Sequence, residues 1–130
     1  MAGRKPMETN ALIITAQGLI QEVYVDFSDY DSMCSIIDAE AVDRLHTSST
    51  LALSEECGVY IQGFVDRKGM EKDLDENEIG AIFSGYSVIF GDVVVCGCNS
   101  NYDYIGLSPE DLKKVSDIIK RRCYILGYPW

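Results

Sequence analysis

Histidine is nearly absent from this sequence. His46 is the only histidine among 130 residues, and no cluster of cysteines or carboxylates accompanies it. A histidine base normally needs an orienting partner, so we expect no catalytic role for His46. Nothing matches a P-loop, a Ser-His-Asp set, a zinc site or a dinucleotide fingerprint. We therefore expect no catalytic residues, no metal and no cofactor, and an enzyme is the least favoured alternative.

Positive charge and long apolar runs are lacking as well. Only 11 Lys and Arg residues stand against 21 Asp and Glu residues, which gives a net charge of −10. Such a surface repels phosphate backbones and anionic lipids, so we expect no direct binding of nucleic acid or membrane. No run approaches the ~20 apolar residues of a membrane span, and Met1 to Glu8 has no apolar signal-peptide core. We expect a cytoplasmic protein that favours basic partners.

The cysteines form no recognisable framework. They are odd in number and spread through apolar contexts, unlike a disulfide scaffold or a zinc knuckle. Cys96-Gly97-Cys98 is the exception, because two thiols two residues apart can share a metal or a redox role. No second pair accompanies it, and alternate residues of a strand share one face. We interpret all five as reduced core thiols: Cys34, Cys57, Cys96, Cys98 and Cys123.

Length and composition indicate one globular domain. The apolar fraction is 47% and the charged fraction 25%, both typical of folded proteins. We expect a flexible leader over residues 1–9 and a single α+β domain over residues 10–130. The sheet is predicted to be antiparallel or mixed, with four to six strands. We expect a C-terminal helix and one or two short helices to cover one side of it.

Hydrophobic patterning predicts the elements of the first half. Ala11 to Thr15 and Leu19 to Phe27 read as an opening β-hairpin with one buried face. Apolar residues at helical spacing predict a short helix over Asp29 to Ile37. Two further strands are expected at Ala41 to Leu45 and at Gly58 to Asp66, and the second leads into a turn, DRKG, that ends at Gly69.

The segment from Asn77 to Gly97 is the best organised of the chain. Asn77 to Tyr86 is predicted to be a short helix that Gly85 ends. Ser87 to Cys96 is the strongest strand, because its apolar run is nearly continuous. Gly91-Asp92 interrupts this run, and either a bulge or a tight hairpin would fit there.

A longer helix is predicted from Ser108 to Leu126. Ser108 is the expected N-cap and Pro109 the first helical residue, while Gly127 and Pro129 stop the helix. The basic residues near its end either complement the helix dipole or form an anion site with a neighbouring loop. These candidate ligand contacts are Lys120, Arg121 and Arg122.

Two polar segments are the other candidate contacts. The loop after Gly97 carries exposed aromatic side chains of the kind that favour binding surfaces, and its candidate residues are Asn99, Asn101, Tyr102, Asp103 and Tyr104. The acidic run before the predicted helix is interpreted as a solvated face that meets a basic partner, with an acid-base or metal role as the alternative. Its residues are Glu71, Asp73, Asp75, Glu76 and Glu78.

The spacing of Asp73, Asp75 and Asn77 matches the first ligands of a calcium loop, but the match ends there. Position 6 of such a loop requires glycine and is Glu78 here, and position 12 is Ser84 in place of a glutamate. We therefore interpret the spacing as accidental.

The order of these motifs resembles the domain-of-unknown-function family numbered 3846, found in small phage, mobile-element and large-virus proteins. The resemblance rests on Asn77-x-x-x-Ala81, on Gly91, on the apolar strand that ends at Gly97 and on the helix start Leu107-Ser108-x-x-Asp111. Members of that family typically carry N-x-x-A and I-x-G-D/T elements, and here Phe90 stands before Gly91, with the β-branched Ile89 one place earlier. The resemblance spans roughly residues 10–119 and carries no catalytic residues.

The resemblance implies a viral or mobile-element context, in which small acidic domains inhibit a host protein or capture a signalling molecule. Our first hypothesis is thus a noncatalytic interaction module that binds or inhibits a host protein with a basic surface, in the host cell cytoplasm. The second is a protein that sequesters a small anionic, nucleotide-like ligand between the tyrosine loop and the basic helix end. An exposed sheet edge would also allow a homodimer.

Overall fold

The computed structural model describes residues 8–45, 52–54, 59–85 and 88–125. Most of the predicted leader, His46, Cys57 and the predicted helix end at Leu126 lie outside this part of the chain. The elements in chain order are β1 (Ala11–Ile14), β2 (Ile20–Val23), α1 (Tyr30–Ser35), β3 (Val42–Arg44), β4 (Ala52–Ser54), β5 (Val59–Asp66), α2 (Glu78–Ser84), β6 (Val93–Cys98), β7 (Tyr104–Ile105) and α3 (Pro109–Ile125).

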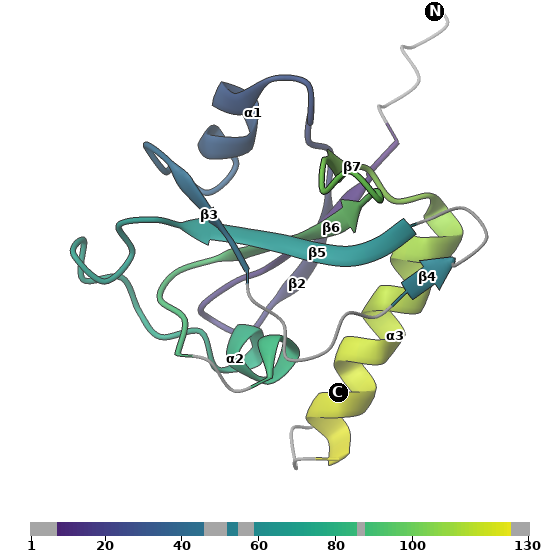
Figure 1. Cartoon of the computed structure of the whole chain (residues 1–130). Helices are drawn as coiled ribbons and strands as arrows, with labels where there is room; N and C mark the ends of the chain where they lie inside the picture. The colour runs from purple at the N-terminus through teal and green to yellow at the C-terminus, as the bar shows by residue number, and fades with distance from the viewer. Residues whose placement is uncertain (1–7, 46–51, 55–58, 86–87, 126–130) are drawn as a thin grey trace, which may run out of the picture.

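An antiparallel sheet forms the centre of the molecule (Figure 1). Five strands follow one another in the order β2-β1-β6-β5-β3, and the short strands β4 and β7 pair with β5 and β6. Every strand pair is antiparallel. The prediction of an α+β domain with a C-terminal helix and two short helices is confirmed.

The opening hairpin is confirmed, but its second strand is shorter than predicted. Residues 15–19 join β1 to β2, and Gly18 in this turn has φ +92°, where residues with a Cβ are strained. The Asn10 side chain then takes both backbone groups of Val25, donating to its carbonyl at 2.8 Å and accepting from its N–H at 2.8 Å. The strand therefore ends at Val23.

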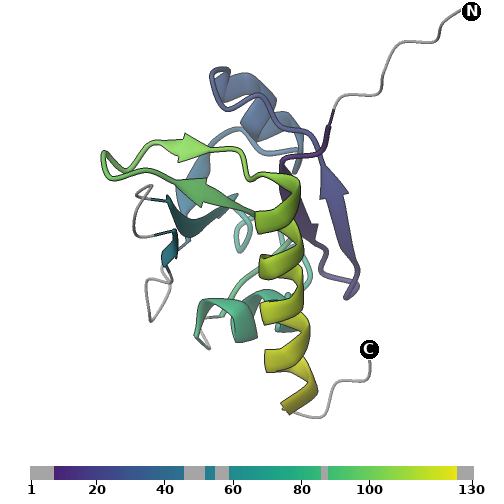
Figure 2. The ribbon, with the colours of Figure 1, turned by 90° about the vertical axis from the view of Figure 1, so that its right-hand side faces the viewer.

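The helices cover both faces of the sheet, not one as predicted. Side chains of β1 and β6 alternate between two apolar clusters, so that Leu12 and Val95 face α2 and α3, whereas Ile13 and Val94 face α1. Figure 1 shows α1 and α2 on opposite sides of the sheet, and Figure 2 shows α3 running past it. Since both central strands are apolar on both faces, each face needs a cover.

The predicted strand from Ser87 to Cys96 is wrong in its first half. Phe90 makes only an isolated bridge with Glu76, and Gly91 has φ +87°. The continuous strand is β6, which begins at Val93 and extends to Cys98. Neither a bulge within a strand nor a tight hairpin occurs at Gly91-Asp92, because the chain turns there before β6 begins at Val93.

Asn77 explains why the chain turns into α2 at this place. It is 1% exposed, and its side-chain oxygen accepts the N–H of Gly80 at 2.8 Å, which caps the helix. Its amide nitrogen donates to the carbonyls of Ile14 (2.8 Å) and Gly91 (2.9 Å). One side chain thus joins α2, β1 and the segment before β6. Gly85 ends α2 at φ +92°, as predicted.

α3 begins as the sequence predicts. The Ser108 hydroxyl accepts the N–H of Asp111 at 3.2 Å, and Pro109 is the first helical residue. One face of the helix is buried against the sheet and α2 through Leu112, Val115, Ile119 and Cys123. Within the described ranges, no helix has the length and apolarity needed to cross a membrane.

Candidate functional site

The turn between β6 and β7 is built on Asn99; we call residues 99–104 the tyrosine turn. The Asn99 side-chain oxygen accepts the N–H groups of Asn101 (2.9 Å) and Asp103 (3.1 Å). The N–H of Tyr102 donates to the Asn99 carbonyl at 3.0 Å. Tyr102 has φ +66° and is 74% exposed. A tyrosine in this backbone region is uncommon, and the hydrogen bonds around it hold it there.

Arg44 of β3 fastens the tyrosine turn to the sheet. Its guanidinium donates to the Tyr102 carbonyl and lies 4.7 Å from the centre of the Tyr104 ring. The same ring meets Phe64 edge to face, with 5.4 Å between the ring centres. Burial raises the pKa of Tyr104 to about 12. This phenol therefore stays protonated at neutral pH and is not a general base.

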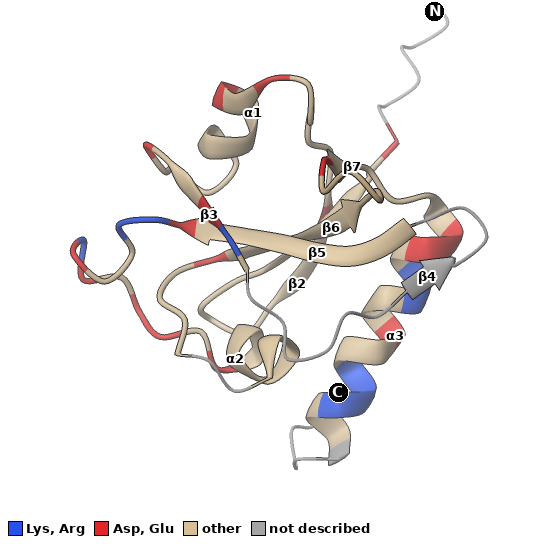
Figure 3. Cartoon of the chain, in the orientation of Figure 1, with Lys and Arg blue, Asp and Glu red and all other residues tan. Residues whose placement is uncertain are grey.

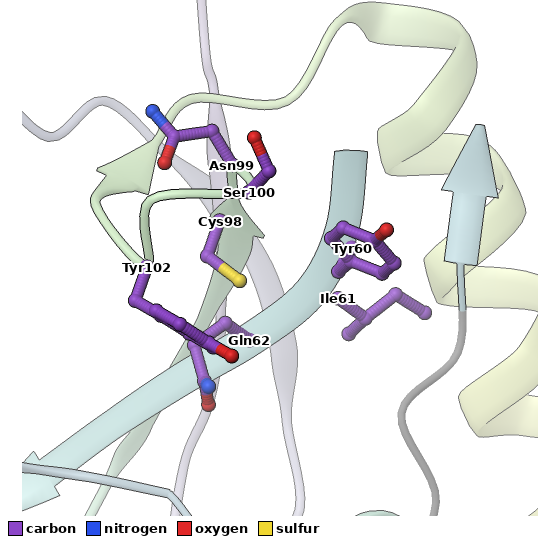
Figure 4. Close-up of a pocket in the computed structure, with 7 residues that line it drawn as sticks. All are labelled: Tyr60, Ile61, Gln62, Cys98, Asn99, Ser100 and Tyr102. Carbon is purple, nitrogen blue, oxygen red and sulfur yellow. The ribbon is translucent and has the colours of Figure 1, made fainter. Parts of the chain in front are cut away.

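A cavity of about 280 Å³ lies between β5 and the tyrosine turn. Figure 4 shows the Cys98 thiol pointing into the space between the rings of Tyr60 and Tyr102. The cavity lies on the α1 face of the sheet, beyond the part that α1 covers. Cys98 lies two positions after the buried core residue Cys96 of β6 and therefore on the same face, and Tyr60 is its paired residue on β5. It is lined by Tyr60, Ile61, Gln62, Cys98, Asn99, Ser100 and Tyr102, with no charged side chain.

The structure does not bring the basic end of α3 to the tyrosine turn. Arg122 is half-buried and donates to the Phe83 carbonyl at the end of α2 (3.2 Å). Lys120 lines a separate groove beside β1 and β2, and Arg121 is exposed. Figure 3 shows the basic end of α3 far from β7 along the helix. The structure therefore places these cations and the tyrosine turn in different parts of the fold.

All five residues of the predicted acidic face are exposed; we call residues 71–78 the acidic segment. Among the four ion pairs of the described residues, none involves Glu71, Asp73, Asp75 or Glu76. Figure 3 shows acidic positions, in red, along the loop between β5 and α2. No group of three or more metal-ligating side chains occurs in the described part of the chain.

Lysine and arginine side chains of the loop between β5 and α2 attach this loop to the rest of the fold. Lys72 pairs with the buried carboxylate of Asp66 at 2.6 Å and donates to the Asp38 carbonyl at 2.9 Å. Burial alone would raise the pKa of Asp66, but the hydrogen bonds from Lys72 and from the Lys68 N–H outweigh it, so this pKa lies below its usual range. Two exposed pairs add to the attachment, Arg67 with Asp43 (2.9 Å) and Lys68 with Glu40 (3.2 Å).

The described cysteines are all buried. Burial raises the pKa of the thiols of Cys96 and Cys123, so both stay protonated at neutral pH. Cys96 packs in the apolar cluster under α1, while Cys98 lies on the same face at the wall of the cavity. This arrangement fits core thiols, and it leaves Cys98 as the thiol that faces a cavity.

Sequence reasoning missed the residues that complete the tyrosine turn. Arg44, Tyr60 and Gln62 come from β3 and β5, and Arg44 lies 58 positions from Tyr102 in the sequence. The alternation of Tyr60, Gln62 and Phe64 places them on one face of a strand. Nothing local, however, reveals which loop that face will meet.

Comparisons with protein-family models, with curated proteins and with solved structures found no match for this chain.

Proposed function

We propose that this protein is a noncatalytic interaction module that binds a basic surface of a partner protein through its acidic segment. The observation that carries the proposal is that Glu71, Asp73, Asp75 and Glu76 are exposed and lie outside every ion pair of the described residues. Unpaired carboxylates on a net charge of −10 attract cationic surfaces and accelerate association with them.

The attachment of the acidic segment supports this role. Lys72, Arg67 and Lys68 are occupied by other acids of the fold, so they do not neutralise the segment. Asn77 fixes its end through three side-chain hydrogen bonds. Charges on a backbone that is already fixed lose less conformational entropy on binding than charges on a flexible loop, and this favours affinity. The motif resemblance adds a host protein as the expected partner, in a host cytoplasm.

The alternative of a small anionic ligand has less support. The cavity at the tyrosine turn has no charged side chain in its lining, and the cations at the end of α3 belong to another part of the fold. An anion in this cavity would lose hydration without gaining a cation. Its volume of about 280 Å³ is also at the lower limit for small-molecule sites.

The test compares two variants that change the net charge equally. The acidic-segment variant carries Glu71→Gln, Asp73→Asn, Asp75→Asn and Glu76→Gln. The control neutralises four other exposed acids with Glu8→Gln, Asp31→Asn, Glu110→Gln and Asp117→Asn. Each protein is immobilised and exposed to lysate of its source cells at about 0.05 M salt, and then eluted at about 0.5 M salt.

We expect the wild-type chain and the control to retain the same salt-released protein, and the acidic-segment variant to lose it. Equal loss in both variants would mean that only the total charge matters. Retention by all three chains would mean that the acidic segment is not the binding surface.

A further inference from the structure

The backbone of β2 is open on one side. β2 is at the end of the strand order of the described residues, with β1 as its only neighbour. The N–H of Thr15 donates to the Leu19 carbonyl at 2.8 Å, and this bond fixes which residues of the strand face β1. By the alternation of an antiparallel ladder, Gln21 and Val23 bond to β1. The N–H and C=O groups of Ile20 and Glu22 therefore point outward from the edge.

Exposed apolar side chains flank the same edge. Leu19, just before β2, is 56% exposed, and Tyr24, just after it, is 41% exposed. Natural proteins usually protect an edge strand with charge, with proline or with a covering segment. β2 has a single charged residue, Glu22. Exposed apolar groups beside free backbone donors and acceptors are the features of a strand that pairs with another strand.

A groove of about 510 Å³ runs between β2 and α3. Its apolar floor includes Leu12 and Leu112, and the side chains of Ile20 and Glu22 form one wall. On the opposite wall lie Lys113, Asp117 and Lys120, and neither lysine takes part in an ion pair of the described residues. Charges of both signs therefore lie beside β2, because Glu22 and Asp117 accompany the two lysines.

We propose that β2 pairs antiparallel with β2 of a second copy of this chain, which joins two sheets into one. Only residues that point outward can exchange hydrogen bonds, so the choice of register is small. Glu22 facing Glu22 would oppose like charges directly. Ile20 facing Ile20 would leave a single hydrogen-bonded pair within β2, because Glu22 would then face Gly18 of the turn, at φ +92°. The register that sets Ile20 against Glu22, about a two-fold axis at Gln21, places two hydrogen-bonded pairs within β2.

This register satisfies both the free backbone groups and the exposed side chains. Each of the two Ile20–Glu22 pairs exchanges an N–H···O bond in both directions. On the α1 face, Leu19 of each copy meets Val23 of the other. On the α3 face, Tyr24 lies opposite Gly18, and Ile20 of each copy lies opposite Glu22 of the other, beside the groove. The surface is complementary to itself, as a two-fold interface requires.

Cysteine cross-linking tests the register. In the proposed pair the two Gln21 residues face each other at a position without hydrogen bonds, where Cα atoms are about 4.5 Å apart, within disulfide range. Gln21→Cys should form a covalent dimer on mild oxidation. The rate should be roughly tenfold higher than for Ile20→Cys or Glu22→Cys, because the two copies of each of those residues do not face each other directly across the axis. Two controls measure the rate of nonspecific cross-linking. They are Gln17→Cys in the exposed turn and the unchanged chain with its native cysteines.

Light scattering tests the pairing itself. At concentrations up to about 1 mM the unchanged chain should approach twice the mass of one chain. Raising the salt should increase the dimer, because two acidic chains repel each other less. Glu22→Pro removes an outward N–H without touching the β1 ladder and should give a monomer, whereas Glu22→Ala keeps that N–H and should stay dimeric. Circular dichroism checks that both variants fold.

Three results would overturn the proposal. One is a monomeric mass for the unchanged chain at every concentration and salt. Another is a Glu22→Pro variant that is folded and as dimeric as Glu22→Ala. The third is cross-linking at Gln21 no faster than at Gln17. The acidic-segment variant should dimerise like the unchanged chain, so failure here is distinguishable from failure of the partner proposal.

Discussion

The acidic segment and the tyrosine turn flank the same sheet but are held by different forces. Ion pairs and a buried amide attach the acidic segment, whose own carboxylates face solvent. The tyrosine turn is held by the Asn99 side chain, by the Arg44 guanidinium and by ring packing, and it encloses a cavity. The first presents charge without a cavity, and the second a cavity without a lining charge.

This difference separates the two candidate surfaces by their response to solution conditions. Binding through exposed carboxylates weakens as salt screens them, whereas packing against aromatic rings is nearly independent of salt. The attachment of the acidic segment also depends on pH through Asp66, while Tyr104 does not titrate near neutrality. Changing one region should therefore leave the other intact, and each experiment below uses that independence.

The largest effect is expected where the acidic segment enters α2. Asn77→Ala removes a helix cap and leaves two buried carbonyls, those of Ile14 and Gly91, without their donor. We expect a loss of about 3 kcal/mol in the free energy of unfolding, measured by urea titration. Asn101→Ala in the tyrosine turn, whose side chain is exposed, should change it by less than about 0.5 kcal/mol. Equal losses would contradict the role given to Asn77.

A smaller loss is expected in the tyrosine turn. Arg44→Met keeps much of the aliphatic stem but removes the bond to the Tyr102 carbonyl and the cation over the Tyr104 ring. It should cost about 2 kcal/mol and speed hydrogen exchange of the amides of Tyr102 and Asp103. The Asn77 amide should exchange as before. Faster exchange at both places would mean that the two regions unfold together.

Acid should weaken the acidic segment selectively. The pKa of Asp66 is lowered in the fold, so its stabilisation is fully present above its usual value of 3.8 and is lost as the pH falls through the folded value. Asp66→Asn should remove this part of the pH dependence and cost about 1 kcal/mol at pH 7. Glu71→Gln, at an exposed site, is the matched control and should leave the dependence unchanged. A thermal-unfolding series from pH 2 to pH 7 distinguishes the two.

The smallest effect concerns the exposed carboxylates themselves. Neutralising Glu71, Asp73, Asp75 and Glu76 relieves repulsion in an acidic chain, so the free energy of unfolding at low salt should rise by a few tenths of a kcal/mol. The gain should vanish at about 1 M salt. A destabilised variant would indicate that these side chains hold the fold together.

Local rules predicted the elements that depend on neighbouring residues. The cap at Ser108, the stop at Gly85 and the turn after Asp66 all follow from side chains within a few positions of one another. The prediction failed at residues 88–92, since an apolar run resembles a strand whether or not a partner strand lies beside it. Gly91 at φ +87° shows that the chain turns there.

Contacts between segments that are distant in the sequence could not be predicted from it. Arg44 is not among the candidate contacts from the sequence, because its contact with Tyr104 depends on the pairing of β3 with β5. The sequence suggests an anion site that combines the tyrosine turn with the cations at the end of α3, yet Arg122 donates to the Phe83 carbonyl at the end of α2. Register and layer order decide such contacts, and a single sequence does not contain them explicitly.

The most direct test of the acidic segment is zero-length carbodiimide cross-linking of the wild-type chain to the protein it captures, followed by mass spectrometry. This reagent joins a carboxylate only to an amine in direct contact. We predict cross-links from Glu71, Asp73, Asp75 or Glu76 to lysines of the partner, and their disappearance at about 0.5 M salt. Cross-links confined to Glu110, Asp117 or the α1 region would contradict the proposed function.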